Sequence, residues 1–145
     1  ALMQALMLIF REAEGLRAPS LMMGETGPNE PKERARRELV RQCTEWILLN
    51  LQAPHTVGSL AAGQHVSEST LQRAFAAEMG MPPHLFVQMA RVRQAEKLMV
   101  TTSMSLEEIA AEVGLSSAHY LNRAFKRFYR TAPRDWRAQR MEYPK

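Results

Sequence analysis

One polar-faced helical pattern occurs twice in this chain, and the duplication constrains its fold more than any other feature. Residues 67–75 have the sequence SESTLQRAF, and residues 116–125 have the sequence SSAHYLNRAF. A short helical pattern precedes each copy, VGSLAAG in the first and LEEIAAEVG in the second. A brief turn around Gly63 to Val66 or Gly114 to Leu115 separates the two parts. Each copy therefore predicts a helix, a tight turn and a second helix.

Cap residues support these helix boundaries. Thr56 and Ser105 are candidate N-caps of the two first helices, and Ser105 has Glu108 three residues later, which is the spacing of a capping box. Ser67 and Ser116 can cap the two second helices. Both copies thus have local signals for where their helices start.

Further helices are expected around the two copies. Apolar residues at every fourth position predict a helix over about residues 32–52. Between the copies, two prolines can open one continuous helix over about residues 83–101, which spans about 27 Å at 1.5 Å per residue. Because no alternating strand pattern occurs, the expected fold is all-α with about seven helices. Two helix-turn-helix subdomains, at about residues 56–80 and 105–130, are joined by the long linker helix.

The segment before residue 32 differs in composition. Apolar residues recur at helical spacing from Leu2 onward, so residues 1–17 are expected to form an extra N-terminal helix. Its apolar side either packs on the rest of the chain or forms a homodimer seam through residues 2–17. Residues 18–31 contain three prolines and two glycines, which is typical of a linker before a main domain at residues 32–145. Because no initiator Met is present, residues 1–17 are expected to end a longer segment.

The charge balance favours an anionic partner, although an ordinary basic protein has the same balance. The chain has 19 Lys and Arg against 15 Asp and Glu, a net charge of +4 and a pI near 9.6. Its single cysteine, Cys43, excludes an intramolecular disulfide and favours a cytoplasmic setting. Cys43 lies on the apolar stripe of its helix, which predicts a core role. The apolar start, residues 1–10, is shorter than the roughly 20 residues of a membrane span, so no membrane partner is expected.

The second helices of the two copies each combine a buried face with a polar face. The expected buried positions are Leu71, Ala74, Phe75 and Met79 in the first copy, and Leu121, Ala124, Phe125 and Phe128 in the second. The polar faces carry Ser69, Gln72, Arg73 and Ala76 in the first copy, and His119, Asn122, Arg123, Lys126 and Arg130 in the second.

These polar faces suit double-stranded DNA. Gln or Asn can pair with adenine in the major groove, and Arg can pair with guanine. Successive major grooves on one side of a duplex lie about 34 Å apart, so a linker helix of about 27 Å could set the two units for adjacent grooves. Between His119 and Arg140 the chain has seven basic residues against the single acid Asp135, and this stretch is expected to lie on phosphate. The seven are Arg123, Lys126, Arg127, Arg130, Arg134, Arg137 and Arg140. Thr131 can cap a last helix there.

Residue patterns for metal binding or catalysis are missing from the sequence. The four histidines, at positions 55, 65, 84 and 119, have no i, i+4 pairing and no cysteine neighbours, so neither a metal site nor a cofactor is expected. His119 is the one on a polar face, and DNA contact is preferred to catalysis for it. No catalytic residue is assigned.

With these motifs in place, the stretch from about Arg34 to Arg140 resembles the DNA-binding domain of the AraC/XylS transcription regulators. The resemblance runs through LAAGQHVSESTLQRAFAAEMGMPP, VRQAEKLM and SLEEIAAEVGLSSAHYLNRAFKRFYRTAPRDWR, in the order and spacing of the family's two-unit signature. Three positions differ from the family pattern: Arg130 stands where the family usually has Gly, and Leu115 and Leu121 stand where it has aromatic residues.

The resemblance implies a seven-helix, two-lobed domain that binds an asymmetric site along one face of bent DNA and usually activates transcription by contacting RNA polymerase. The implied base contacts are Ser69, Gln72, Arg73, Ala118, His119, Asn122 and Arg123. Phosphate contacts are expected at Ser67, Ser116, Lys126, Arg130 and Thr131. Residues 1–31 would be the last helix and linker of a missing sensor and dimerisation domain, which alone would bind a small-molecule effector.

Two alternatives remain open at this point. Some DNA-repair methyl acceptors carry a related DNA-binding module beside a reactive cysteine, and Cys43 would be its counterpart here. A helical protein-interaction module is the other alternative, because an apolar helix at residues 1–17 could bind a partner. This second alternative predicts no affinity for duplex DNA, whereas the DNA-binding hypothesis predicts affinity that falls steeply with salt.

Overall fold

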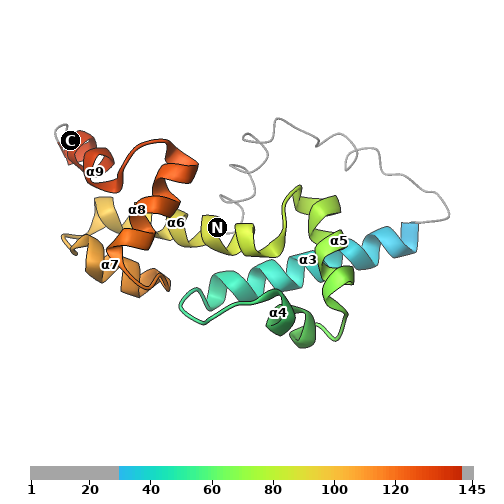
Figure 1. Cartoon of the computed structure of the whole chain (residues 1–145). Coiled ribbons are helices and arrows are strands. Elements are labelled where there is room, and N and C mark those ends of the chain that lie inside the picture. The colour runs from blue at the N-terminus through green and yellow to red at the C-terminus, as the bar shows by residue number, and fades with distance from the viewer. Residues whose placement is uncertain (1–29, 142–145) are drawn as a thin grey trace. The chain divides into compact units, whose positions relative to one another are not determined.

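The computed structural model describes residues 30–141 as seven α-helices without a strand (Figure 1). The helices are α3 (Glu30–Leu49), α4 (Val57–Gly63), α5 (Glu68–Met79), α6 (Pro83–Thr101), α7 (Leu106–Val113), α8 (Ala118–Tyr129) and α9 (Pro133–Met141). The predicted all-α fold is confirmed, since two helix-turn-helix pairs, α4–α5 and α7–α8, flank the long helix α6 in the sequence. The helix predicted over residues 1–17 lies outside the described residues. Within residues 30–141, no helix combines the length and hydropathy that a membrane span requires.

The chain divides into two compact units. Within the described range, unit 1 consists of residues 30–49 and 55–85, and unit 2 consists of residues 50–54 and 86–141. Helices α3, α4 and α5 therefore belong to unit 1. Nearly all of α6 belongs to unit 2 together with α7, α8 and α9.

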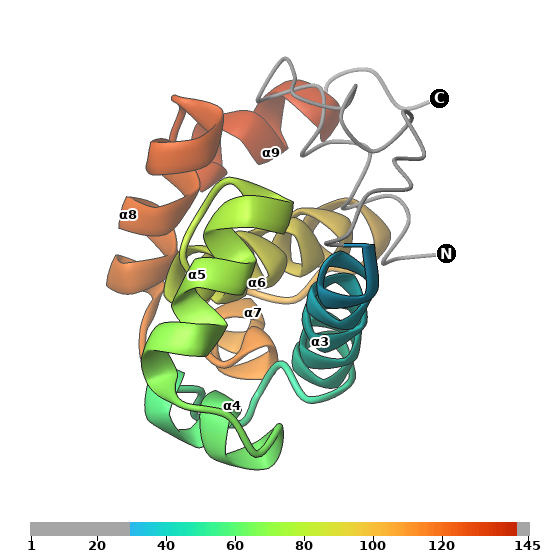
Figure 2. The same ribbon diagram turned by 90° about the vertical axis from the view of Figure 1, so that its right-hand side faces the viewer.

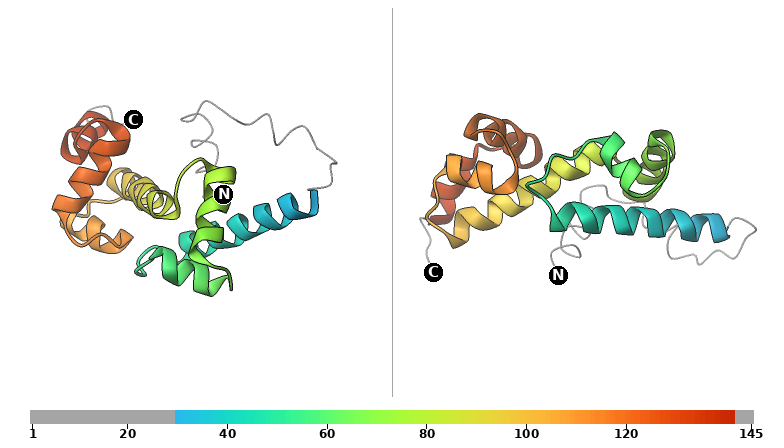
Figure 3. Two further views of the ribbon diagram at one scale, coloured as in Figure 1. Left: turned by 45° about the vertical axis from the view of Figure 1, so that its right-hand side comes forward. Right: turned by 90° about the horizontal axis from the view of Figure 1, so that it is seen from below.

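Unit 1 is built on α3, a long unbroken helix that packs against α5 (Figure 3). The turn between α4 and α5 brings the shorter α4 against α5 as well (Figure 2). The buried residues of unit 1 include Val40, Cys43 and Ile47 of α3, Leu60 and Ala61 of α4, and Leu71, Ala74, Phe75 and Met79 of α5. The predicted buried face of α5 and the core position of Cys43, which is 1% exposed, are therefore confirmed.

The core of unit 2 is aliphatic toward α6 and α7 and aromatic toward α9. Val92, Ala95 and Met99 of α6 pack with Ile109, Ala110 and Val113 of α7, and with Leu121, Ala124 and Phe125 of α8. Trp136 of α9 completes the cluster, its ring centroid 5.6 Å from that of Phe125 in an edge-to-face arrangement. Three of the four predicted buried positions of α8 are buried, and the fourth, Phe128, is partly buried against the same cluster.

Three of the four helices in the two helix-turn-helix pairs have the N-cap that the sequence predicted. Thr56 caps α4 in a capping box with Ser59, Ser67 caps α5, and Ser105 caps α7 in the predicted capping box with Glu108. The prediction that Ser116 caps α8 is wrong. Ser117 is the cap, and its hydroxyl accepts a hydrogen bond from the Tyr120 amide. From cap to cap the second copy is one residue longer than the first, 12 positions from Ser105 to Ser117 against 11 from Thr56 to Ser67, so Ser116 lies one residue before the cap position.

The predicted cap of the last helix is also wrong. Helix α9 begins at Pro133, so the residue directly before it is Ala132, whose methyl side chain cannot accept a hydrogen bond. The Ala132 carbonyl accepts a hydrogen bond from the Trp136 amide at 2.9 Å, as the carbonyl of a residue before a helix does. Thr131 lies one residue too early to cap this helix.

Each unit has one glycine and one non-glycine residue at positive φ. In unit 1, His65 lies in the turn at φ 60° and Gly80 ends α5 at φ 73°. In unit 2, the turn contains Gly114 at φ 93°, and Arg130 ends α8 at φ 60°. Arg130 thus adopts the left-handed conformation that glycine favours, and its amide still donates to the Lys126 carbonyl at 2.9 Å.

Two arginines of unit 2 bind backbone carbonyls of its loops. Arg91 of α6 donates to the carbonyls of Leu51 and Ala53 at 3.0 and 2.7 Å. Arg137 of α9 donates to three carbonyls at the end of α6 and in the loop after it: Met99 at 3.1 Å, Thr102 at 2.8 Å and Met104 at 2.8 Å. Hydrogen bonds from a charged donor are stronger than those from a neutral one, so both arginines fix connecting segments of unit 2.

Candidate nucleic-acid interface

The outer face of α5 presents the predicted base-contacting residues of unit 1. Ser69, Gln72 and Arg73 are all exposed, as is Ala76 one turn further on. The Arg73 guanidinium donates to the Ser69 hydroxyl at 3.3 Å, a long hydrogen bond between two exposed groups. Such a bond is weak in water, so the guanidinium remains available to a ligand. These residues form one ridge along the helix, here called the α5 ridge.

The outer face of α8 presents the corresponding residues of unit 2. His119, Arg123 and Lys126 are exposed, and Ala118 and Asn122 are half-buried beside them. Together they form the α8 ridge. Its residues follow those of the α5 ridge 50 positions later, so that Gln72 corresponds to Asn122, Arg73 to Arg123 and Ala76 to Lys126.

Four of the five predicted phosphate-contacting residues lie at the ends of the two ridges, and the fifth, Lys126, belongs to the α8 ridge itself. Ser67 and Ser116 are exposed before α5 and α8, although the Ser67 hydroxyl is already engaged as the cap of α5. Arg130 is exposed at the C-terminal end of α8, and Thr131 beside it is half-buried. Both ends of α8 therefore carry polar groups that a phosphate could approach.

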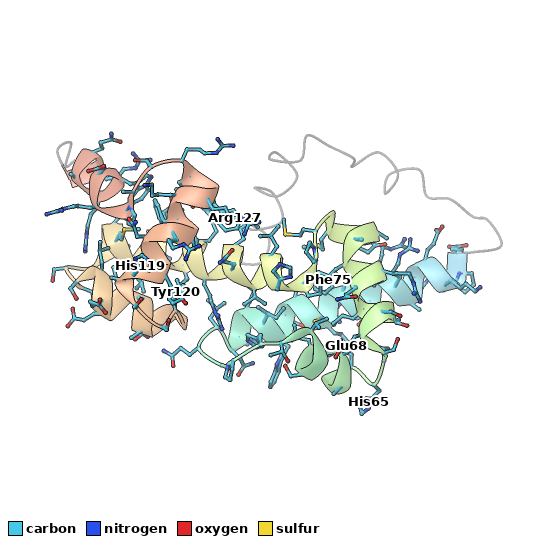
Figure 4. The ribbon with its side chains drawn as sticks, in the orientation of Figure 1. His65, Glu68, Phe75, His119, Tyr120 and Arg127 are labelled. Carbon is cyan, nitrogen blue, oxygen red and sulfur yellow. The ribbon has the colours of Figure 1, made fainter. Side chains whose placement is uncertain are left out.

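An aromatic side chain near the start of α8 was not among the predicted contacts. Tyr120 is 53% exposed and lies beside His119, with the ring centroids 6.0 Å apart and the planes at 71° (Figure 4). Its counterpart in α5 is Thr70. The sequence could have indicated that Tyr120 is exposed beside the polar face, because it falls outside the buried stripe of α8.

Helices α5 and α8 differ in charge. Helix α5 has Arg73 against Glu68 and Glu78, which gives a formal charge of −1, whereas α8 has Arg123, Lys126 and Arg127 with no acid, which gives +3. Glu78 is moreover engaged with Arg36 of α3 at 2.8 Å and has a side chain only 10% exposed. The basic character of the interface is therefore concentrated on α8.

Part of the predicted basic surface of unit 2 is engaged within the fold. Arg137 was counted among the phosphate-facing residues, but its guanidinium binds three backbone carbonyls. Arg127 donates to Gln88 of α6 at 3.3 Å, and the Arg140 guanidinium lies over the Trp136 ring at 4.3 Å. A count of basic residues in the sequence thus overestimates the free positive charge. Arg123 and Lys126 of the ridge, and Arg130 at its end, remain exposed.

A polar cluster holds the C-terminal end of α8 against α6. The Tyr129 hydroxyl donates to the Glu96 carboxylate at 2.5 Å, and Arg93 binds both Glu96 and the Tyr129 hydroxyl. Burial, and then the hydrogen bond to Glu96, raise the pKa of Tyr129 to about 12. Since α8 carries the ridge, this cluster helps to fix the ridge on unit 2.

Metal binding and thiol chemistry find little support among the described residues. Among them, no group of three His, Cys, Asp or Glu side chains is placed to hold a metal ion. Burial raises the pKa of the Cys43 thiol to about 11, so little of it is thiolate at neutral pH. Cys43 is therefore poorly suited to act as a nucleophile.

Comparisons with known proteins agree with this geometry. A helix-turn-helix domain family matches residues 60–139. An uncharacterized HTH-type transcriptional regulator, YfiF of Bacillus subtilis (strain 168), is 40% identical over 76 residues, which make up 52% of this chain and 24% of that protein. The chain therefore spans about a quarter of the length of this curated relative.

Solved structures show the same fold. The DNA-binding domain of the transcriptional factor AdpA, solved with a target DNA, is 30% identical with a TM-score of 0.69, and the match covers 72% of this chain and 96% of that one. A transcriptional regulator from Chromobacterium violaceum, described as having an AraC-type DNA-binding domain, shares the fold with a TM-score of 0.69 at 24% identity, over 77% of this chain and 99% of that one. The duplicated helix-turn-helix, its long central helix and these matches show that the chain belongs to the AraC/XylS family of transcription regulators.

Proposed function

We propose that this chain is the sequence-specific DNA-binding domain of a transcription regulator, and that the α5 ridge and the α8 ridge each enter a major groove. Ser69, Gln72 and Arg73 contact bases from the first ridge. Ala118, His119, Asn122 and Arg123 contact bases from the second. Ser67, Ser116, Lys126, Arg130 and Thr131 contact phosphate. The family is one of regulators rather than enzymes, and we propose no catalytic activity for this chain.

One observation carries the proposal. In both units an amide side chain is followed directly by an arginine on the outer face of the second helix of a helix-turn-helix, as Gln72–Arg73 and Asn122–Arg123. These are the side chains that pair with adenine and guanine edges, and the recognition helix is the element that enters the groove. The AdpA domain, which matches over most of this chain, was solved with a target DNA, which further supports the proposal.

Further partners follow from the family. We propose that the whole protein acts in the cytoplasm, mainly as an activator that contacts RNA polymerase. A sensor domain outside this chain would bind the small-molecule effector, and residues 2–17 would form a homodimer seam. Support comes from the apolar spacing of those residues in the sequence. A promoter-fused reporter, assayed with and without the regulator, distinguishes activation from repression.

Selection of binding sites from random duplexes tests the central proposal. The chain is expected to enrich one asymmetric site with two short conserved blocks about one helical turn apart. Affinity for that site is expected to fall steeply as salt rises, because phosphate contacts release counterions. Enrichment of no sequence, together with affinity that does not respond to salt, would contradict the proposal and favour a protein-interaction module.

A second test addresses the methyl-acceptor alternative. The chain is incubated with duplex DNA that carries a labelled alkyl group, and Cys43 is then analysed by peptide mass. Because the thiol is buried and its pKa is raised to about 11, we expect it to remain unmodified. Transfer of the label to Cys43 in the folded protein would establish the enzymatic alternative instead.

A further inference from the structure

A carboxylate in unit 2 lies at the start of the recognition helix. Glu107 of α7 is exposed, and its carboxylate accepts a hydrogen bond from the backbone amide of Ala118 at 3.3 Å. Ala118 is the first residue of α8 and directly precedes His119 of the α8 ridge. The side chain of Glu107 thus reaches from one helix of the pair to the ridge of the other.

Unit 1 has a carboxylate in the matching place, but from the opposite helix. Glu68 is the first residue of α5 and corresponds to Ala118, and Gly58 of α4 corresponds to Glu107. The Glu68 carboxylate lies against Gly58, so closely that a Cβ atom on Gly58 would come within 2.9 Å of its Oε2 atom. Each unit therefore places one carboxylate between its two helices at the start of the ridge. In unit 1 the glutamate is on the second helix and the small residue on the first, and in unit 2 this order is reversed.

We infer that Glu68 and Glu107 are specificity-determining residues for DNA, each reading the amino group of a cytosine at the edge of its half-site. This inference rests on the proposed function. The first residues of a recognition helix are those that meet base edges in the major groove. Ala118 has only a methyl group with which to do so, and Glu107 supplies the polar group that is missing at that position.

The chemistry of a carboxylate decides which partner it accepts. An ionised carboxylate has only acceptors, so in the major groove it matches the N4 amino group of cytosine and opposes the acceptor atoms of guanine. It also repels phosphate. On non-target DNA the negative charge therefore weakens binding, and on the target the cytosine amino group offsets this loss. Such a residue contributes to discrimination between sequences rather than to overall affinity.

The test compares Glu107→Gln with Glu112→Gln, measured on the full chain. Both changes remove one exposed negative charge from α7, but Glu112 lies at the other end of the helix. Both variants are expected to bind random duplex more tightly than the wild type. Only Glu107→Gln is expected to lose cytosine preference at one selected position, with a fall of about fivefold or more in the ratio of target to random affinity. Glutamine keeps an acceptor for the Ala118 amide, so the fold of α8 is retained.

Glu68→Gln gives an independent measurement in the other unit, where a second selected position is expected to lose its cytosine preference. The inference is overturned if Glu107→Gln and Glu68→Gln keep every base preference of the wild type and change affinity only as Glu112→Gln does. A wild-type chain that selects no site at all would instead contradict the proposed function itself. The two failures are therefore distinguishable in one set of selections.

Discussion

Helices α5 and α8 have the same length of 12 residues and the same buried spacing, but their formal charges differ by four, −1 against +3. Residues that build the scaffold repeat at a distance of 50 positions, as in Leu71 and Leu121 or Phe75 and Phe125. The outer faces diverge, and Ala76 of α5 is replaced by Lys126 in α8. On the proposed function both ridges read bases, and the charge difference leads us to expect that α8 supplies most of the attraction to phosphate.

The two units also share backbone conformations at positions where their residue types differ. The turn and the end of the recognition helix have positive φ in both units, yet glycine occupies only one of the two places in each. Gly114 is in the turn of unit 2, and Gly80 is at the helix end of unit 1. Backbone geometry is therefore retained even where a residue that adopts it less readily has to do so.

The largest effect is expected from Gly114→Ala. A Cβ atom at this position would lie 2.4 Å from the Leu51 carbonyl oxygen, and the backbone is at φ +93°. The overlap and the left-handed backbone together are expected to lower the free energy of unfolding by about 3 kcal/mol, measured by urea denaturation.

Gly63→Ala is the matched control, because a Cβ atom there would meet nothing within 4 Å and Gly63 lies in α4. It is expected to leave stability unchanged or raise it by up to about 1 kcal/mol. Equal losses from the two substitutions would show that neither the Leu51 contact nor the positive φ constrains Gly114.

The next effect concerns the two ridge arginines. Arg123→Ala and Arg73→Ala are each expected to weaken binding to the selected site by about 2 kcal/mol and to relax the preference at one position. The relaxed position belongs to a different half of the site for each variant. Titration of wild-type and variant chains with the selected duplex measures both losses. If both variants kept the wild-type site and affinity, the assignment of these contacts would be wrong.

Removing a positive charge from the α8 ridge and adding one at the matching position of the α5 ridge tests the difference in phosphate contact between them. Lys126→Ala is expected to weaken binding to all sequences alike and to reduce the slope of log affinity against log salt by about 1. Ala76→Lys places the same charge on α5 and is expected to raise that slope by about 1. Should Ala76→Lys leave the slope unchanged, the α5 ridge would not lie near phosphate at that turn.

A smaller effect is expected at the end of α8. Arg130 has φ 60°, and Arg130→Gly removes the strain of that conformation, so the free energy of unfolding is expected to rise by about 1 kcal/mol. The same change removes an exposed charge, so the salt slope should fall by about 1 if Arg130 contacts phosphate. Gly80→Ala in unit 1 is the reverse experiment and is expected to destabilise. A gain of stability without a change in slope would remove Arg130 from the phosphate contacts.

The smallest effect is expected only in alkaline solution. It concerns Tyr129 of unit 2, a titratable group that has no titratable counterpart in unit 1. The pKa of Tyr129 is raised to about 12 in the folded chain, above the ordinary value of 10. The protonated hydroxyl is favoured by folding, so its contribution to stability is fully present below pH 10 and is lost as pH rises toward 12.

Tyr129→Phe should therefore lose less stability than the wild type between pH 10 and 12, measured by denaturant titration. Its counterpart in α5 is Met79, which does not titrate. Tyr120→Phe, at the exposed tyrosine of the same helix, serves as the control. Parallel curves for the wild type and Tyr129→Phe would contradict the raised pKa of Tyr129, to which burial and then the Glu96 contact contribute.

Features that depend on local periodicity were predictable from the sequence. The buried stripes of α5 and α8 and the core position of Cys43 follow from helical spacing alone. The cap of α8 was misplaced by one residue because Ser116 and Ser117 are both suitable caps. The distance of 50 residues between Leu71 and Leu121 indicates Ser117, since it is the counterpart of Ser67.

Contacts between distant segments were not predictable. Arg137 has the same appearance in the sequence as Arg134, yet only Arg137 is half-buried and binds three carbonyls about 35 residues earlier. The link from Glu107 to Ala118 likewise depends on how α7 meets α8. Helical periodicity identifies which face of a helix is polar, but it does not show which polar groups are satisfied by the protein itself.

The three carbonyl bonds of Arg137 bear on where this chain can be shortened. A fragment that ended at Tyr129 would leave the peptide oxygens of Met99, Thr102 and Met104 to find water, and it would uncover the Phe125 ring that Trp136 now covers. Helix α9 is therefore part of the structural core of unit 2 and cannot be removed without exposing these groups. Fusion proteins and minimal DNA-binding fragments should keep the polypeptide intact through Arg140.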